Sequence, residues 1–325
     1  MTDAHHRFEP EIAGASPAGS AGLLEESIDA IERARPDLEP ASRRRAALHR
    51  FLRRPLAVAG LVVLVVLALG AVFAGVLTPY PANPDLTDPA VLAEARQGPS
   101  LDHWFGTDTV GADQLTRVLF GLRVSLAIGL GTALLSTVVG VAVGAIGGYY
   151  GRWVDSVLMR GTDLALLLPT IAVLLVVADR LGGSIPGMIV VLSLLSWMPV
   201  ARIVRGEFLT LREQPFVEAA RASGATGRHI VARHLLPNVA GTVVVFATLL
   251  VGFSILTEAL LSFLGAGVEP PAVSLGVLIS DAERTAGTSL AYLLYYPGIV
   301  LFVLVLAVNF VGDGVRAALD PHRRS

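Results

Sequence analysis

Six long apolar runs leave few folds open to this chain. A helix that crosses a bilayer needs about 20 mostly apolar residues, and in lipid only helices or closed barrels satisfy their own backbone groups. The runs therefore predict an all-α polytopic membrane protein with six transmembrane helices. The first run lies too far from the N-terminus to be a cleaved signal peptide, so we expect it to be retained. The predicted spans are 56–77, 122–148, 160–180, 185–204, 239–264 and 290–311.

Composition agrees with a membrane protein and excludes several classes. The chain is 53% hydrophobic and 16% charged, whereas a soluble domain has roughly 25% charged residues. Its net charge of −2 argues against a nucleic-acid binder. There is no cysteine, and all 25 basic residues are arginines. A P-loop needs a lysine on the nucleotide phosphates, so if ATP drives this protein, another subunit hydrolyses it.

Arginine placement predicts the orientation. Positive residues concentrate in cytoplasmic flanks, and most near-membrane arginines fall inside when both termini are cytoplasmic. The expected organisation is then a disordered acidic cytoplasmic tail, a basic amphipathic membrane-surface segment, a first span, an extracytoplasmic loop, a core of five spans, and a cytoplasmic C-terminus. These parts are 1–41, 42–55, 56–77, 78–121, 122–312 and 313–325.

A polar segment, EAARASGATGRHIVARHLLPN (218–238), interrupts the apolar runs. Pro215 suits the first position of a helix, Gly224 suits a left-handed helix end, and Thr226 can cap a second helix. Pro237 then opens the fifth span. This predicts a helical hairpin over 213–238, with a first helix short enough to enter a groove on another protein. The alternative is a loop that packs only on its own bundle.

Few other residues carry chemistry. Gly140, Gly144 and Gly148 share one helix face and predict close helix packing, either static or sliding. Charges at membrane depth are costly and mark functional candidates, which makes Glu258 and Asp163 candidate gate or pathway residues. Asp163 lies one turn from Arg160 and could pair with it, and Glu258 could instead make a structural hydrogen bond or an interchain pair. No metal-ligand motif or nucleophile elbow occurs.

The polar segment resembles the EAA loop of ABC importer permeases, E-A-A-x-x-x-G followed by L-P. The likeness covers about residue 45 to the end and includes RRPLAVAG (53–60), HWFGTDTVGADQLTRVLFGLRVSL (103–126), GGYYGRWVD, EALLSFLGAGVEPP and NFVGDGVRAALDP. These motifs are similar to the dipeptide/oligopeptide/nickel permease family, in its second, C-type permease. His234 stands where general versions have isoleucine, which resembles the peptide branch. Ala112 and Leu275 depart from the family's usual Arg and Trp in outside loops, so contact with the binding protein or substrate is expected to differ there.

The resemblance implies a non-catalytic permease subunit of a peptide importer in the bacterial cytoplasmic membrane. Its implied partners are a homologous second permease, two ABC ATPase domains that hold ATP and Mg, an extracytoplasmic solute-binding protein and membrane lipid. No cofactor is expected on this chain. The alternatives are nickel, glutathione, an opine or another small solute as cargo, an ion-coupled carrier acting alone, and a non-transporting scaffold. The implied ATPase-coupling residues are Glu218, Ala219, Ala220, Arg221, Gly224 and Pro237; the implied binding-protein contacts are Gly106, Asp108, Pro270 and Pro271.

Overall fold

The computed structural model describes residues 47–85 and 87–319. The chain separates into two units that each make contacts mainly within themselves, with the boundary after Ala47. The larger unit, from Leu48 onward, contains the helical bundle. The predicted acidic tail, 1–41, lies outside the described residues. Apart from one isolated bridge between Thr107 and Asp113, the regular structure of the described part is helical, as predicted.

The helices vary widely in length. The long ones are α3 (Pro55–Val72), α6 (Gln114–Tyr150), α7 (Arg152–Leu166), α8 (Thr170–Leu181), α9 (Ile185–Leu211), α12 (Leu236–Phe263) and α14 (Tyr292–Leu319). The short ones are α4 (Ala74–Leu77), α5 (Pro89–Ala93), α10 (Pro215–Ala222), α11 (Gly227–Ile230), the π-helix η1 (Val231–Leu235), α13 (Leu275–Ala282) and the 3₁₀-helix η2 (Glu283–Thr285).

Five helices of the described part are long and apolar enough to cross a membrane, or six spans if a bent pair counts as one. The bent pair is the predicted third span, 160–180. It is not one straight helix: α7 and α8 meet at 88°. Pro169 has no backbone N–H and disfavours the helical conformation of the residue before it, so the helix ends at Leu166 and resumes at Thr170.

Other boundaries also differ from the sequence prediction. Helix α6 begins at Gln114 instead of 122, because the Asp113 side chain accepts a hydrogen bond from the Thr116 N–H and caps its first turn. Helix α14 runs on to Leu319. The loop predicted at 265–289 contains α13, whose Leu275 and Leu278 are buried.

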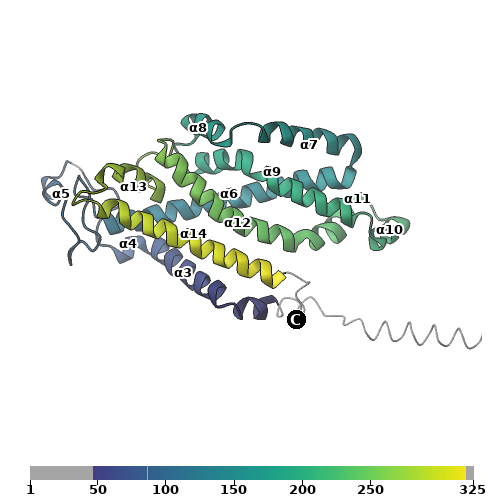
Figure 1. Cartoon of the computed structure of the whole chain (residues 1–325), viewed down its shortest axis with the longest axis horizontal. Helices are drawn as coiled ribbons and strands as arrows, with labels where there is room; N and C mark the ends of the chain where they lie inside the picture. Colours follow the sequence, from purple (N-terminus) through teal and green to yellow (C-terminus); the bar gives the residue numbers. More distant parts are fainter. Residues whose placement is uncertain (1–46, 86, 320–325) are drawn as a thin grey trace, which may run out of the picture. The chain divides into compact units, whose positions relative to one another are not determined.

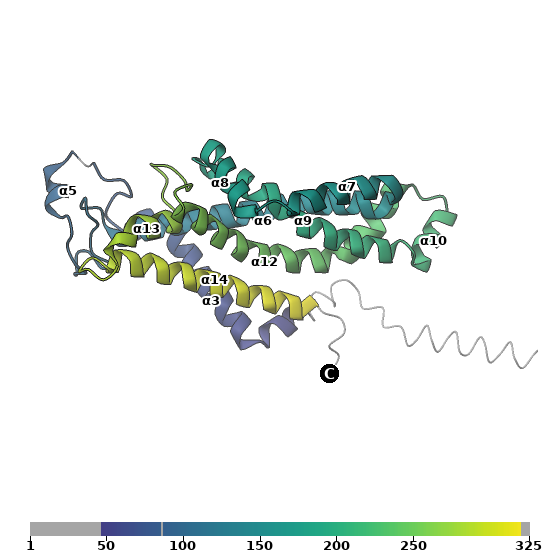
Figure 2. The ribbon, with the colours of Figure 1, turned by 45° about the horizontal axis from the view of Figure 1, so that its top comes forward.

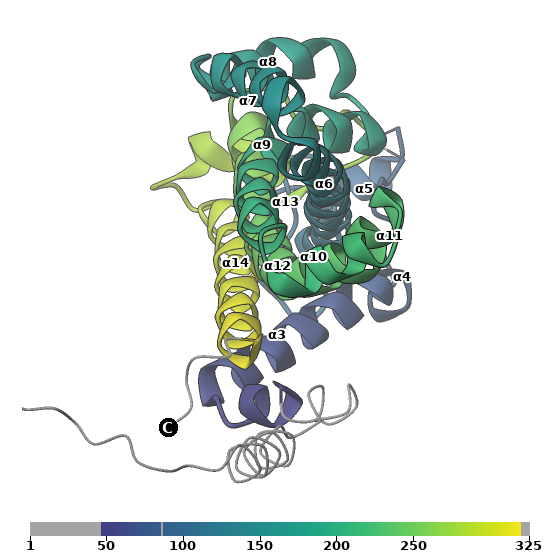
Figure 3. The ribbon, with the colours of Figure 1, turned by 90° about the vertical axis from the view of Figure 1, so that its right-hand side faces the viewer.

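The long helices run side by side between two ends (Figure 1, Figure 2). One end carries α10 and the other carries α5 and α13, and we call them the α10 end and the α13 end. Viewed along the bundle, α6, α9 and α12 lie centrally, with α3 and α14 on one side and α7 and α8 on another (Figure 3). The start of α3 packs against the end of α14, since a Cβ on Gly314 would collide with Ala57 and Phe51. The start of α3 and the end of α14 both point toward the α10 end (Figure 1).

The most extensive helix contact is between α6 and α9, and it uses the predicted glycine face. A Cβ on Gly140 would lie 2.6 Å from the Val200 Cβ, and one on Gly148 would lie 2.5 Å from the Phe208 Cβ. A Cβ on Gly144 would strike the Ala201 carbonyl oxygen. All three glycines are buried. The small-residue face thus lets the two backbones touch directly, as expected for helices that associate in lipid.

Candidate functional site

The local structure of the hairpin at the α10 end follows from the backbone preferences of its residues. Helix α10 ends in a Schellman motif, in which the Ala225 N–H donates to the Ala220 carbonyl (3.0 Å) and the Gly224 N–H to the Arg221 carbonyl (2.9 Å). Gly224 has φ +81°, a conformation that glycine adopts without strain. The Thr226 hydroxyl then accepts from the His229 N–H at 3.4 Å and caps α11. The two helices are held at a fixed turn.

One face of the hairpin is seated on the bundle. Val217, Ile230 and Leu235 are buried in a cluster with Val204 and Phe208 of α9. The end of α6 supplies the second support. There a Cβ on Gly227 would come within 2.8 Å of the Tyr149 hydroxyl, and the Arg221 guanidinium lies 6.0 Å from the Tyr149 ring centroid. The hairpin is therefore braced against the ends of two central helices.

The other face of α10 is open. Glu218, Ala219 and Arg221 are exposed, as is Gly224, while Ala220 is half-buried. Among the described residues the Glu218 carboxylate makes no hydrogen bond or ion pair. The exposed alanine allows close approach of another backbone, with one acidic and one basic group beside it. An eight-residue helix is marginal alone in water, so its support comes from the seated face and from whatever contacts the open one.

The hairpin continues into α12 without a gap. Residues Val231–Leu235 form a π-helix, and Pro237, which has no N–H to donate to the preceding turn, follows it at the start of α12. π-Helical turns are rare and are frequently found at functional sites. No sequence signal predicted this one. The whole stretch Gly227–Phe263 behaves as one 37-residue span.

Helix α7 is fastened to α9 by arginine–carboxylate pairs. Arg205 holds Asp155 through two nitrogens, one of them 2.6 Å from Oδ2. Arg202 pairs with Asp163. The sequence had suggested Arg160 as the partner of Asp163, but the structure brings Arg202 to it from the neighbouring helix. Asp163 thus serves in an exposed contact between helices.

The two pairs differ in exposure, which predicts different energies. The side chains of Asp155 and Arg205 are 15% and 33% exposed, against 61% and 45% for Asp163 and Arg202. Hydrogen bonds to charged groups contribute most when water is excluded. Asp155→Asn should therefore lower the stability of the purified protein in detergent by about 2 kcal/mol, measured as a lower melting temperature. Asp163→Asn is the matched control and should change stability by less than about 1 kcal/mol. Equal losses of stability in Asp155→Asn and Asp163→Asn would contradict this ranking.

Toward the α13 end, Glu258 of α12 is fully buried. Its carboxylate accepts hydrogen bonds from the hydroxyls of Ser125, Ser262 and Ser274. The predicted gate or pathway candidate thus lies at a junction of α6, α12 and the start of α13. These three hydrogen bonds fit the other interpretation of the sequence, in which Glu258 makes structural hydrogen bonds.

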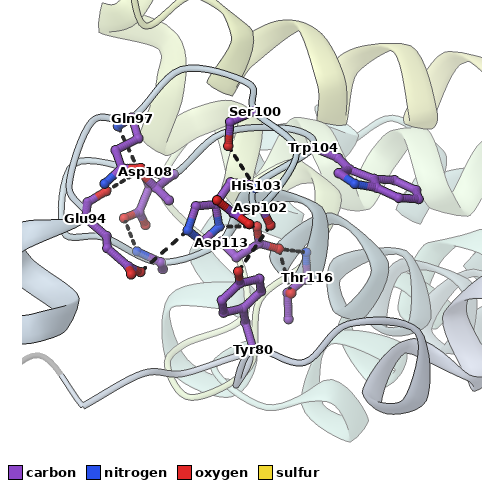
Figure 4. A network of polar contacts seen from close by, with 12 residues as sticks. Tyr80, Glu94, Gln97, Ser100, Asp102, His103, Trp104, Asp108, Asp113 and Thr116 are labelled. Atoms are coloured by element: carbon purple, nitrogen blue, oxygen red, sulfur yellow. Dashed lines mark hydrogen bonds and ion pairs between the residues drawn. The ribbon is translucent and has the colours of Figure 1, made fainter.

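A polar cluster organises the loop before α6 (Figure 4). His103 is 3% exposed; its Nδ1 lies 2.9 Å from an Asp113 oxygen and its Nε2 lies 3.5 Å from a Glu94 oxygen. The Tyr80 ring packs against His103 at 4.6 Å. Burial raises the pKa of Tyr80, with smaller contributions from nearby carboxyl groups, and its hydroxyl donates to the Asp102 carbonyl at 3.1 Å. The motif HWFGTD thus builds a folded loop.

Two predicted binding-protein contacts support this loop from within. Gly106 has φ +73°, and a Cβ there would meet the Gln97 carbonyl at 2.6 Å and the Tyr292 ring at 2.7 Å. The buried Asp108 carboxylate accepts from the Val110 and Ala112 N–H groups at 2.9 Å each and from Arg117 at 2.5 Å. Both residues have structural roles here, whatever they contact outside.

Pro270 and Pro271 do lie on the surface, where the Pro271 carbonyl accepts from the Asn83 side chain at 3.1 Å. Ala112 and Leu275, the two departures from the family motifs, do not lie on the surface. Ala112 is 4% exposed and Leu275 is fully buried. We expect them to alter an outside contact, but both side chains lie within the chain's own packing. Ala112 lies in the turn that the Asp108 carboxylate closes, and Leu275 lies in an apolar cluster at the start of α13.

Cavities and clusters add little that is catalytic. Beside α13, an open cavity of about 380 Å³ is lined by Asp108, Gln114, Arg117 and residues of α13. In its wall the Arg117 guanidinium lies 3.7 Å from the Asp281 carboxylate. Within the described part of the chain, no three His, Asp or Glu side chains come together to hold a metal ion.

Comparison with known proteins gives consistent matches. The family described as "Binding-protein-dependent transport system inner membrane component" matches residues 136–325, and "N-terminal TM domain of oligopeptide transport permease C" matches residues 42–99. The oligopeptide transport system permease protein OppC of Mycobacterium tuberculosis (strain ATCC 25618 / H37Rv) is 41% identical over 88% of this chain and 97% of its own.

Two more relatives and one solved structure agree with these matches. A provisionally named peptide permease protein of Brucella suis is 43% identical over 84% of this chain and 89% of its own. The glutathione transport system permease protein GsiD of Pectobacterium atrosepticum is 38% identical, over 85% and 90%. A chain of the inward-facing methionine ABC transporter MetNI has a TM-score of 0.50 at 23% identity, covering 62% of this chain and 96% of that one. That structural likeness bears on the fold alone.

Proposed function

The chain belongs to the family of binding-protein-dependent transport system inner membrane components, and we propose that it is the peptide-translocating C-type permease of an ATP-driven importer. It is a multi-pass inner-membrane protein. The observation that carries the peptide assignment is the near full-length identity of 41–43% to relatives named as oligopeptide or peptide permeases. The 38% identity to a glutathione permease keeps that small peptide as the second cargo candidate, ahead of nickel or an opine.

Helix α10 is our candidate for the contact with an ATPase subunit. Its seated face is buried on α6 and α9, while Glu218, Ala219 and Arg221 remain open for a partner. A chain without lysine has no P-loop of its own, so ATP with Mg would bind to two partner ATPase domains. Nucleotide-driven movement of those domains would reach the spans through the braced hairpin. ATP can shift the conformations only if the partner contact differs in free energy between them.

This role places the α10 end in the cytoplasm. The start of α3 and the end of α14 both point toward that end (Figure 1), which agrees with the arginine distribution and predicts cytoplasmic termini. The loops of the α13 end would then face outward. There an extracytoplasmic solute-binding protein would deliver cargo near Pro270 and Pro271, and a homologous second permease would complete the path within the bilayer.

The competing class, an ion-coupled carrier acting alone, has weaker support. Such a carrier needs titratable groups along its spans. In the described part of the chain, the buried carboxylates are Asp108, Asp113 and Glu258, and the first two lie in the loop and cap before α6. Glu258 is occupied by three serines. Reconstitution of the chain alone in liposomes would discriminate, because only the carrier would transport without an ATPase.

Uptake in a deletion strain tests the proposal directly. Cells that lack the chain should take up labelled di- to pentapeptides slowly, and the restored gene should recover uptake only when the ATPase partners are intact. Labelled glutathione and nickel are the parallel cargoes. Recovery of nickel uptake without peptide uptake would contradict the peptide assignment.

A further inference from the structure

The Glu258 carboxylate ties α12, which carries it, to α6 and to the start of α13. Ser274, just before α13, donates to Oε1 at 2.6 Å. Ser262, one turn along α12, donates to the same oxygen at 2.7 Å, and Ser125 of α6 donates to Oε2 at 3.2 Å. Each of the three serines is buried. The group is a closed polar junction inside an apolar bundle.

Two of these serines also hold the backbone of α13. The Ser125 hydroxyl oxygen accepts from the Leu275 N–H at 3.1 Å, and the Ser274 oxygen accepts from the Val277 N–H at 3.2 Å. A hydroxyl has one proton to donate and lone pairs to accept with. Because Glu258 draws both protons toward itself, it turns the lone pairs toward the first turn of α13, whose N–H groups have no partner within the helix.

The position of α13 shapes the α13 end of the bundle. Its Leu275 and Leu278 are buried with Leu122, Ile255 and Leu304, in contact with α6, α12 and α14. Ser125 lies 11 residues into α6, about 16 Å along the helix from its first residue. The start of α13, which contacts Ser125, therefore lies inside the bundle and not at its surface. Leu278, Asp281 and Ala282 of α13 form one wall of the 380 Å³ cavity.

Apolar packing alone does not fix this helix, because it is non-directional, whereas hydrogen bonds to a buried group have a defined geometry. We propose that Glu258 is a positioning residue for transport, which latches α13 onto α6 and α12 through Ser125, Ser262 and Ser274 and so sets the outer closure of the path. The latch rests on the proposed permease function for its role in uptake, but not for its existence.

A single introduced cysteine can report the position of α13, because the native chain has none. Ala282 is 4% exposed at the end of α13, so a thiol in Ala282→Cys is protected while α13 is docked. Adding Glu258→Ala or Ser274→Ala should raise its rate of alkylation by a membrane-impermeant maleimide about tenfold, the typical loss for a hydrogen bond to a charged group. Glu258→Gln keeps one oxygen for Ser262 and Ser274 and should restore most of the protection.

Peptide uptake gives the second readout, measured without the cysteine. Glu258→Ala should lower the maximal rate several-fold and leave the half-saturating peptide concentration unchanged, since Glu258 acts through α13. Ser254→Ala is the matched control: Ser254 is 1% exposed on the same helix, and its hydroxyl has no partner in the described part of the chain. It should change neither readout.

The results separate the latch from the transport assignment. Native alkylation rates in both Glu258→Ala and Ser274→Ala, or an equal increase in Ser254→Ala, would overturn the latch. If Glu258→Ala does not accumulate in the membrane, Ser274→Ala decides the matter. A native chain that transports no peptide would refute the proposed function, while the alkylation rates would still decide whether the latch exists.

Discussion

Glu218→Arg should abolish ATP-driven peptide uptake and leave the chain folded in the membrane. The carboxylate is exposed on the open face of α10 and contacts no other charged group among the described residues, so charge reversal costs the isolated chain little. At a partner interface, replacing one member of a charge pair typically costs at least about 2 kcal/mol, so uptake should fall at least about 30-fold. Uptake assays with immunoblots of the membrane fraction measure both effects.

Glu213→Arg is the control for this charge reversal. Glu213 is exposed just before α10, and Arg212 lies 3.8 Å from it, so the variant carries the same charge change outside the open face. It should keep near-native uptake. Gly224→Pro should behave as Glu218→Arg does, because proline cannot adopt a φ of +81° and lacks the N–H that closes the turn. Normal coupled uptake in Glu218→Arg would refute the docking role of α10.

The second large effect is expected at the α6–α9 contact. Gly144→Leu places a side chain where the Ala201 carbonyl and Val204 already lie, so the helices must separate. Separation exposes the facing glycines and forfeits close packing along the contact, at a cost above about 3 kcal/mol. Little folded chain should then accumulate in the membrane. The amount that survives detergent extraction and size-exclusion chromatography measures this loss.

Gly161→Leu provides the same substitution without the collision. Gly161 lies on α7, and nothing stands within 4 Å of the place that a Cβ would take there. Leucine has a better helix propensity than glycine by roughly 0.8 kcal/mol, so this variant should accumulate at least as well as the native chain. Similar losses in both variants would show that glycine matters at Gly144 for another reason than backbone contact.

Sequence reasoning succeeded where one local rule decided the outcome. The left-handed residue at Gly224, the cap at Thr226 and the proline at the start of α10 all follow from backbone preferences of single residues. Apolar run length likewise located five of the six predicted spans as long helices. In these places no distant part of the chain had to be known.

Sequence reasoning failed where the local structure depends on a partner residue that is distant in the sequence. Asp163 pairs with Arg202 of α9 and not with the nearer Arg160, since only the folded bundle brings α7 beside α9. Helix α13 was missed because its eight residues are too few to show a helical period, and its first N–H is satisfied from Ser125, 150 residues away. The break at Pro169 follows from the backbone limits of proline, but the 88° angle between α7 and α8 depends on packing.

The unbroken run from α11 through η1 to α12 gives the molecule a long lever. At 1.5 Å per residue, its 37 residues span about 55 Å, from the hairpin to the neighbourhood of Glu258. A rigid rod of that length moves its far tip by about 1 Å for each degree of tilt. Small rotations imposed at the α10 end would therefore exceed the tolerance of a hydrogen bond at the far end, unless the π-helix at Val231–Leu235 absorbs them.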